Sequence, residues 1–274
     1  NQSITQLINI FVTPTNSINY TFTNAGATGR QGPTQANIDS SYTGTNLAGI
    51  VTINTTGIQE WVVPASGIYR IEALGASGGD GGDLANGGND GDYSGGLGAK
   101  MSGDFSLTAG EKLYLLVGQQ GLSHYNYNGS GGGGSFVAKG AQLAQTSPLL
   151  VAGGGGGGGI HYNQDATTSE SGLDAKTNNG PNSLGGTNGQ GGQGGTSQGS
   201  GGGGGFFGDG SGTAYSSSYH GKSFQNGGFG GNGNSNQGDG GFGGGGWGGG
   251  WRHSLQPRCD HIRVWFGCQN QQWT

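Results

Sequence analysis

The chain carries few charged residues. Asp, Glu, Lys and Arg make up only 9% of its 274 residues, and 10 basic against 15 acidic residues leave a formal net charge of -5. Electrostatic repulsion of the kind that keeps intrinsically disordered chains open is therefore weak. The absence of a basic cluster argues against binding to nucleic acid or to an anionic membrane surface.

Proline, cysteine and long apolar runs are also in short supply. Six prolines and no three-residue glycine period exclude collagen. No run reaches the ~18 apolar residues of a membrane-spanning helix. The two cysteines, Cys259 and Cys268, could close a small disulfide loop, and a free or intermolecular thiol is the alternative.

Glycine, by contrast, fills 70 positions, often in runs such as 153–159 and 201–205. Glycine loses more backbone entropy on ordering than any other residue. A chain with this much glycine is therefore either never ordered or ordered by an unusual backbone lattice.

One such lattice is open to glycine because it has no side chain. It can form the left-handed helix with three residues per turn, which has no internal hydrogen bonds. Neighbouring helices without Cβ atoms could exchange backbone hydrogen bonds. Single aromatic residues between the runs could flank such a bundle, namely Phe206, Phe207, Phe229, Phe242 and Trp247. The alternative is a flexible glycine-serine linker.

The first 152 residues predict β-structure. Short β-branched or alternating segments, bounded by glycine and proline, are typical of a β-sandwich, and no helical periodicity is convincing. The predicted strands are 4–12, 18–22, 50–53, 61–63, 69–74, 105–107, 113–117, 135–138 and 149–152.

Several sequence segments of this chain resemble the extracellular glycine-rich region of anaplastic lymphoma kinase and leukocyte tyrosine kinase. They occur in the same order over roughly residues 20 to 250. The segments are YTFTNAGATG at 20–29, GPTQA at 32–36, GIQEWVVPA at 57–65, YRIEALGASGG at 69–79, LYLLVGQQG at 113–121, PLLVAG at 148–153, GKSFQ at 221–225 and GGFGG at 240–244.

The resemblance implies a mainly β fold, a TNF-like β-sandwich with an inserted bundle of polyglycine II helices. It also implies an extracellular location and, in the receptors, a cytokine-binding surface. The expected division is an N-terminal β-strand extension at 1–19, the sandwich at 20–152 with a glycine-rich loop at 75–98, the helix bundle at 153–250, and a C-terminal segment at 251–274.

Three departures from the receptors stand out. Ala25 and Ile38 occupy positions where the receptors carry cysteines, which is what the loss of one disulfide as a unit would look like. No kinase domain or membrane span follows the glycine-rich part. The receptors close their sandwich with a late strand, for which 261–266 is the only candidate here.

Motifs for catalysis are weak. Residues 75–79 match the G-x-S-x-G pattern around Ser77, but no helix is predicted after them. Gly221-Lys222-Ser223 ends like a phosphate-binding loop, but Ser216 stands where its first glycine belongs. We therefore expect no enzymatic activity and no cofactor.

Two kinds of polar site remain open. Asp80, Asp83, Asp90 and Asp92 partly fit a glycine-aspartate calcium repeat, although a solvated acidic loop is the preferred interpretation.

N-glycosylation sequons at Asn19, Asn54 and Asn128, with a further one at the terminal Asn1, favour an extracellular, secreted protein. The start at Asn1, without methionine, agrees with a processed chain.

The N-terminal segment is strongly β-prone and uncharged, with apolar residues Ile4, Leu7, Ile8, Ile10, Phe11 and Val12. Added to the sheet of the next molecule, it would build head-to-tail filaments. In its own sheet it is simply the first strand. The first hypothesis is thus a structural protein that assembles with itself into a filament or adhesive matrix. The alternative is a receptor-like module that binds a protein ligand, with the four aspartates as its acidic face.

Overall fold

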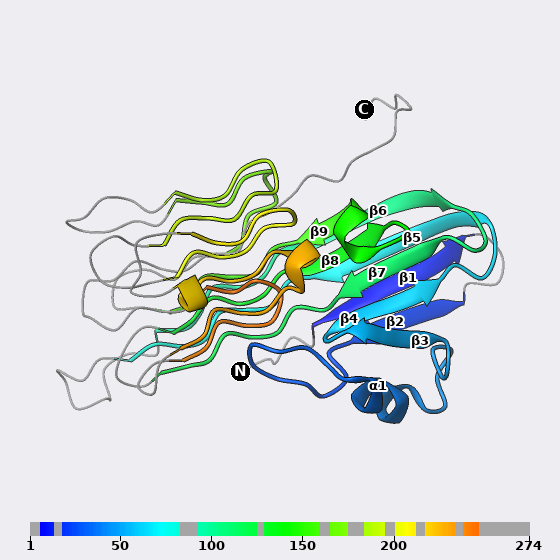
Figure 1. The fold of residues 1–274 in the computed structure, drawn as a ribbon, viewed down its shortest axis with the longest axis horizontal. Helices are drawn as coiled ribbons and strands as arrows, with labels where there is room; N and C mark the ends of the chain where they lie inside the picture. Colours follow the sequence, from blue (N-terminus) through cyan, green and yellow to red (C-terminus); the bar gives the residue numbers. More distant parts are fainter. Residues whose placement is uncertain are drawn as a thin grey trace.

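The structure is a computed structural model that describes residues 6–13, 18–82, 93–124, 129–158, 165–174, 184–194, 201–211, 217–233 and 238–246. Two regions lie end to end along the longest axis, a pair of β-sheets and a set of long parallel traces without regular secondary structure (Figure 1).

The β region consists of two sheets in which every pair of neighbouring strands is antiparallel. The first sheet has the order β2-β1-β5-β6, formed by Asn19–Thr23, Leu7–Thr13, Gly67–Leu74 and Lys100–Leu107. The second has the order β3-β4-β7-β8-β9, formed by Val51–Thr55, Ile58–Val62, Lys112–Leu116, Ser135–Lys139 and Ser147–Ala152. The prediction of a mainly β protein is confirmed.

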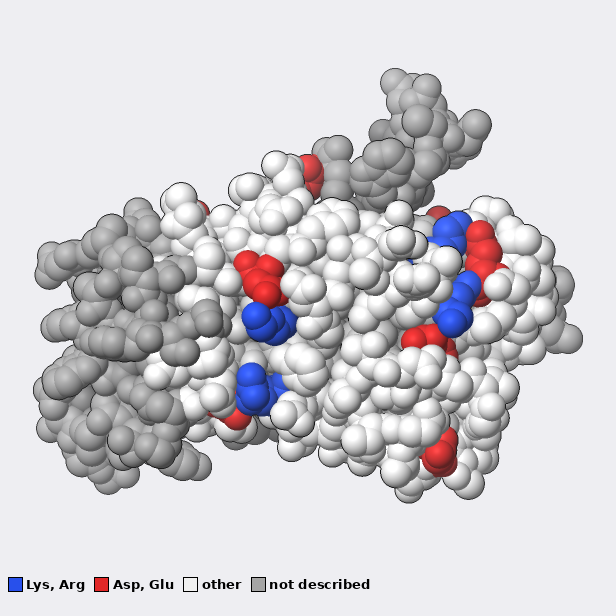
Figure 2. Space-filling view, viewed as in Figure 1, with Lys and Arg blue, Asp and Glu red and all other residues white. Residues whose placement is uncertain are grey.

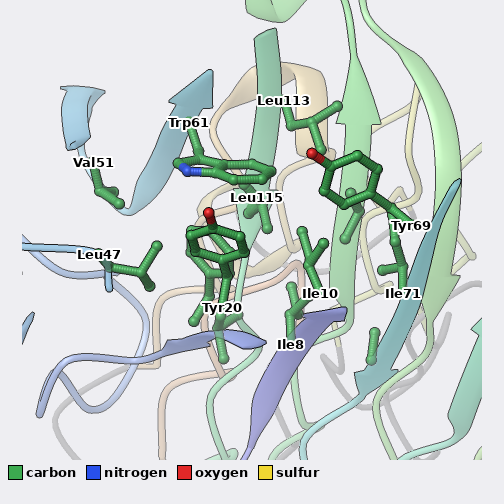
Figure 3. Packing of buried hydrophobic residues seen from close by; sticks show 14 of the residues in the cluster. Ile8, Ile10, Tyr20, Leu47, Val51, Trp61, Tyr69, Ile71, Leu113 and Leu115 are labelled. Carbon is green, nitrogen blue, oxygen red and sulfur yellow. The ribbon is translucent and has the colours of Figure 1, made fainter. Parts of the chain in front are cut away.

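The apolar faces of the two sheets meet around Trp61. Its indole ring lies 4.8 Å from the ring of Tyr20 and 5.8 Å from that of Phe22, measured between centroids. Ile8 and Ile10 of β1 and Ile71 of β5 are fully buried in the same cluster (Figure 3). In β2, and in β5 from Ile68 on, buried residues alternate with exposed or half-buried ones, which puts every second side chain into this core.

One helix was missed by the sequence analysis. The helix α1, Gln35–Tyr42, begins at a capping box in which the Thr34 side chain accepts the Asn37 N–H and the Asn37 side chain accepts the Thr34 N–H. Only Ile38 and Tyr42 of this helix are buried. The sequence therefore offered a single apolar pair, four residues apart, as evidence of helical periodicity. Three short 3-10 helices complete the described structure: η2 at Leu143–Gln145, η3 at Ser217–Tyr219 and η4 at Phe224–Asn226.

The α1 segment covers the outer edges of both sheets on one side. The Gln35 side chain accepts the Ile53 N–H at 2.7 Å and donates to the Val51 carbonyl at 3.1 Å, so it pairs with edge strand β3 as a neighbouring strand would. The Tyr42 hydroxyl accepts the Thr23 N–H of edge strand β2 at 2.9 Å. Burial raises the pKa of Tyr42 despite this hydrogen bond. These contacts remove edge groups that would otherwise pair with another chain.

The N-terminal segment that was proposed as a donor strand is β1 of its own sheet. Ile10 pairs with Tyr20 of β2 on one side and with Ile71 of β5 on the other. Because β1 is central, both of its edges are occupied, and donation to another molecule would require its removal from this sheet. The structure agrees with the alternative interpretation, in which this segment is the first strand of its own sheet. Of the six assembly residues, Ile4 lies outside the described part of the chain.

Candidate functional site: the glycine array and the open face of the sandwich

A hydrogen-bonded array of glycine-rich segments continues from one end of the sandwich. Its first members are the β5–β6 connection, the β7–β8 connection and the chain that follows β9 (Figure 1). The sequence analysis placed the glycine bundle at 153–250 and treated 75–98 as a glycine-rich loop of the sandwich. In the structure, residues of 75–99 and residues of 119–134 from the β7–β8 connection also belong to the array.

Backbone hydrogen bonds within the array recur every third residue. Residues 75–81 run antiparallel to 93–99, and the bonds join Gly75 N to Ala99 O at 2.9 Å, Gly78 N to Gly96 O at 3.0 Å and Gly81 N to Tyr93 O at 2.9 Å. Adjacent residues of an antiparallel β-ladder would instead alternate with a period of two. The pairing is therefore not that of a sheet.

The segment at 75–81 forms backbone hydrogen bonds with several neighbouring segments at once. Every third residue bonds to the same neighbour, and the next residue along the chain bonds to a different one. The residues at 76 and 79 donate their N–H groups to the segment at 130–133 and accept from the segment at 155–158. The residues at 77 and 80 accept from the segment at 121–124. The bonds are Ala76 N to Gly133 O, Gly79 N to Ser130 O, Gly155 N to Ala76 O, Gly158 N to Gly79 O, Gly121 N to Ser77 O and His124 N to Asp80 O.

This packing leaves no room for side chains. A Cβ atom added to Gly78 would lie 2.5 Å from the carbonyl carbon of Gly156 and closer still to its oxygen. A Cβ on Gly155 would meet the carbonyl group of Gly96 in the same way, 2.4 Å from its carbon. Glycine is thus required here for close backbone approach.

Aromatic side chains fix the later glycine-rich segments to the second sheet. Phe206, Phe224 and Phe242 are fully buried against the outer face of that sheet. The ring of Phe224 stacks on Phe206 at 4.9 Å and on Phe136 of β8 at 5.3 Å. Phe206 and Phe242 therefore have the flanking role predicted for them. Phe207 is 44% exposed, Phe229 is partly buried, and Trp247 lies outside the described residues.

Asp209 holds the GKSFQ segment in place. Its carboxylate accepts the Ser223 N–H at 2.8 Å, the Lys222 ammonium at 2.9 Å and the Asn226 side-chain amide at 2.9 Å. Burial acts to raise the pKa of Asp209, but these three donors outweigh it and hold the pKa below its usual value. The segment that looked like a phosphate loop is therefore a structural anchor for Phe224.

The outer face of the first sheet is the open face of the molecule. The outward residues of β2, β5 and β6 are exposed or half-buried, whereas Phe206, Phe224 and Phe242 cover part of the second sheet. Ile68 is 52% exposed there, and Arg70 lies 3.3 Å from Asp104 and 3.6 Å from Glu72 between charged atoms. Lys100 lies 3.9 Å from Glu72.

The side chains of these four charged residues are 26% to 66% exposed. Exposed ion pairs contribute little to stability, because solvent and salt screen them. Figure 2 shows the opposite side of the molecule, on which β4, β7 and β8 lie in front in Figure 1; charged side chains are few there, with the two signs close together. The open face presents a compact set of four charges beside an exposed isoleucine.

The structure describes some of the predicted site residues and not others. Asp80 uses one carboxylate oxygen to accept the Gly95 N–H at 2.9 Å, a structural contact within the array. No group of three potential metal ligands occurs among the described residues. Asn19 and Asn54 are exposed, on edge strands β2 and β3. The remaining predicted sites lie outside the described residues: Asp83, Asp90, Asp92, Asn128, Cys259 and Cys268.

Comparison with known proteins finds a similar sequence in a receptor. No model of a known protein family matches the chain. The leukocyte tyrosine kinase receptor of Mus musculus is 41% identical over 106 residues, which cover 37% of this chain and 11% of the receptor. The chain thus spans about a ninth of the length of the relative that it matches. In the described part of the chain, no helix is long and apolar enough to cross a membrane.

Proposed function

We propose that this chain is an extracellular, non-enzymatic, receptor-like module that binds a protein ligand. The observation that carries the proposal is its 41% identity to part of a protein named as a receptor. The exposed sequons at Asn19 and Asn54 fit the same location.

Within this proposal, the two regions are a TNF-like β-sandwich and a bundle of polyglycine II helices. The support for the helices is the three-residue period of the hydrogen bonds, which equals the three residues per turn of that helix. In addition, the described glycines of 129–134 and 153–158 are not among those with positive φ. The bundle gives a ligand-binding module a stiff frame that is held by backbone hydrogen bonds and fixed to the second sheet by Phe206, Phe224 and Phe242.

The open face of the first sheet is the proposed ligand surface. It presents Ile68 together with Arg70, Glu72, Lys100 and Asp104, so it suits a folded protein with a small apolar contact inside a ring of complementary charges. The four aspartates proposed earlier as an acidic face are less favoured, because Asp80 is already engaged within the array.

Assembly into filaments is the less favoured hypothesis. β1 is a central strand, and side chains of the α1 segment occupy hydrogen-bonding groups of the edge strands β2 and β3. Both features act against strand exchange.

The test is a screen of the purified chain against the secreted proteins of its source organism, displayed singly. We expect a saturable partner with one-to-one stoichiometry. The double variant Ile68→Asp, Arg70→Glu should weaken this binding at least tenfold. Val62→Asp, at an equally exposed valine of β4, is the matched control and should leave it unchanged. A chain that forms filaments in light scattering and electron microscopy, and binds no secreted protein, would contradict the proposal.

A further inference from the structure

The sequon at Asn19 lies beside an aromatic ring on the open face. Asn19 of β2 pairs with Phe11 of β1 in the register of the first sheet. The neighbouring pair, Asn9 and Thr21, shows which face these residues share, because the Thr21 hydroxyl donates to the Asn9 side-chain oxygen at 2.8 Å. Tyr20 alternates with Asn19 and is buried in the core.

We propose that Asn19 carries an N-linked glycan whose first N-acetylglucosamine lies over the ring of Phe11. Asn19 is exposed and Phe11 only partly buried, so both are accessible from the same side. Directly opposite residues of an antiparallel pair have Cβ atoms about 4.5–5.5 Å apart. This places the sugar that is bonded to the asparagine amide within reach of the neighbouring ring.

The chemistry of the modification is a transfer from a lipid diphosphate oligosaccharide. A bond forms between the Asn19 Nδ2 atom and C1 of the first sugar, the bond from C1 to the diphosphate oxygen breaks, and the amide loses one proton as the lipid diphosphate leaves. One face of the attached sugar presents C–H bonds, which suit the negative face of a phenylalanine ring. The glycan thereby covers an apolar residue that the sheet leaves partly exposed.

Asn54 is a natural control within the same chain. It is also an exposed sequon asparagine on an edge strand, but it falls where the register between β3 and β4 shifts, and it has no paired residue. A glycan at Asn54 therefore has no aromatic partner in the register and should not stabilise the fold.

The experiment uses the full chain secreted from a eukaryotic host and the same chain made in bacteria. We expect peptide mass spectrometry to find Asn19 glycosylated. In the secreted protein, Asn19→Gln should lower the melting temperature by about 2–4 °C, the range for one aromatic contact in a chain of this size. Asn54→Gln should lower it by less than about 1 °C. In the bacterial protein, Asn19→Gln should have no effect, because no glycan is present.

Two further measurements isolate the first sugar and the ring. Trimming the glycans enzymatically to a single N-acetylglucosamine should preserve the stabilisation. In a Phe11→Leu background, Asn19→Gln should cause no further loss, whereas a Phe11→Tyr background should retain it. An unoccupied Asn19 overturns the inference, and so does a loss that persists without the ring or disappears on trimming.

The inference rests on the extracellular location proposed above, but not on the ligand. Its measurements are occupancy and melting temperature. A chain that binds no protein ligand can therefore still confirm the glycan contact. A chain that lacks the glycan contact can still bind a ligand through β5 and β6.

Discussion

Substitution of Gly78 by alanine is the most direct test of the glycine array. The added Cβ would lie 2.5 Å from the carbonyl carbon of Gly156. Ordinary carbon–carbon contacts are about 3.5–4.0 Å, so the segments at 75–81 and 153–158 must separate by roughly 1 Å.

Such a displacement would break the hydrogen bonds between these segments. The Gly155 N–H to Ala76 O and Gly158 N–H to Gly79 O bonds are both 2.8 Å long, and a further 1 Å takes them beyond hydrogen-bond range. Each of the two buried N–H groups left without a partner, on Gly155 and Gly158, costs about 1–3 kcal/mol. We therefore expect Gly78→Ala to lower the free energy of unfolding by about 2–6 kcal/mol.

The assay is thermal unfolding followed by circular dichroism, with Gly67→Ala as the matched control. Gly67 begins β5, and its added Cβ would lie 3.9 Å from the nearest atom, a side-chain carbon of Val12, which is an ordinary contact. At about 2–4 °C per kcal/mol for a chain of this size, Gly78→Ala should melt at least about 4 °C lower. The control should melt within about 2 °C of the parent. Equal melting of the two variants would refute the close-packed array, and so would rapid amide exchange in residues 75–81.

Three further predictions follow from single contacts. Gln35→Ala should cost about 1–3 kcal/mol and cause concentration-dependent association in light scattering, because it frees the β3 edge; a monomer with parental stability would contradict this. Phe224→Ala should cost about 3–5 kcal/mol and speed proteolysis within 201–246 before the sandwich is cut, whereas simultaneous cleavage of both regions would count against a separate anchoring role. The lowered pKa of Asp209 stabilises the fold at pH values above the ordinary value of 3.8, and this contribution is lost as the pH falls toward the folded-state pKa. Asp209→Asn should therefore be less stable than the parent at pH 7, with a difference that shrinks below about pH 4 in acid titrations.

The strands were largely predictable because the core imposes alternation on them. β2, β5 and β7 fall within one or two residues of the segments marked by apolar and β-branched residues. β6 was predicted at its last three residues only, because Ser102, Gly103 and Asp104 carry no apolar signal on an exposed strand. The helix α1 was missed for the same reason, since its position depends on polar contacts of Gln35 and Tyr42 with distant strands.

The candidate surface was less predictable than the fold. Arg70 and Glu72 come from β5 and Lys100 and Asp104 from β6, and nothing in the sequence shows that these two pairs share a face. The register of β5 and β6 brings them together, as the register of β1 and β2 brings Phe11 beside Asn19.

The sequence by itself determined the mainly β composition and the presence of side-chain-free segments that can pack by their backbones alone. Only the tertiary structure decided which of these segments are neighbours. Glycine carries no side chain that could encode a partner, so the order of the array follows from the strands that lead into and out of it. Those strands are fixed by the buried alternation around Trp61, which places the ends of β5, β7 and β9 and the starts of β6 and β8 at one end of the sandwich.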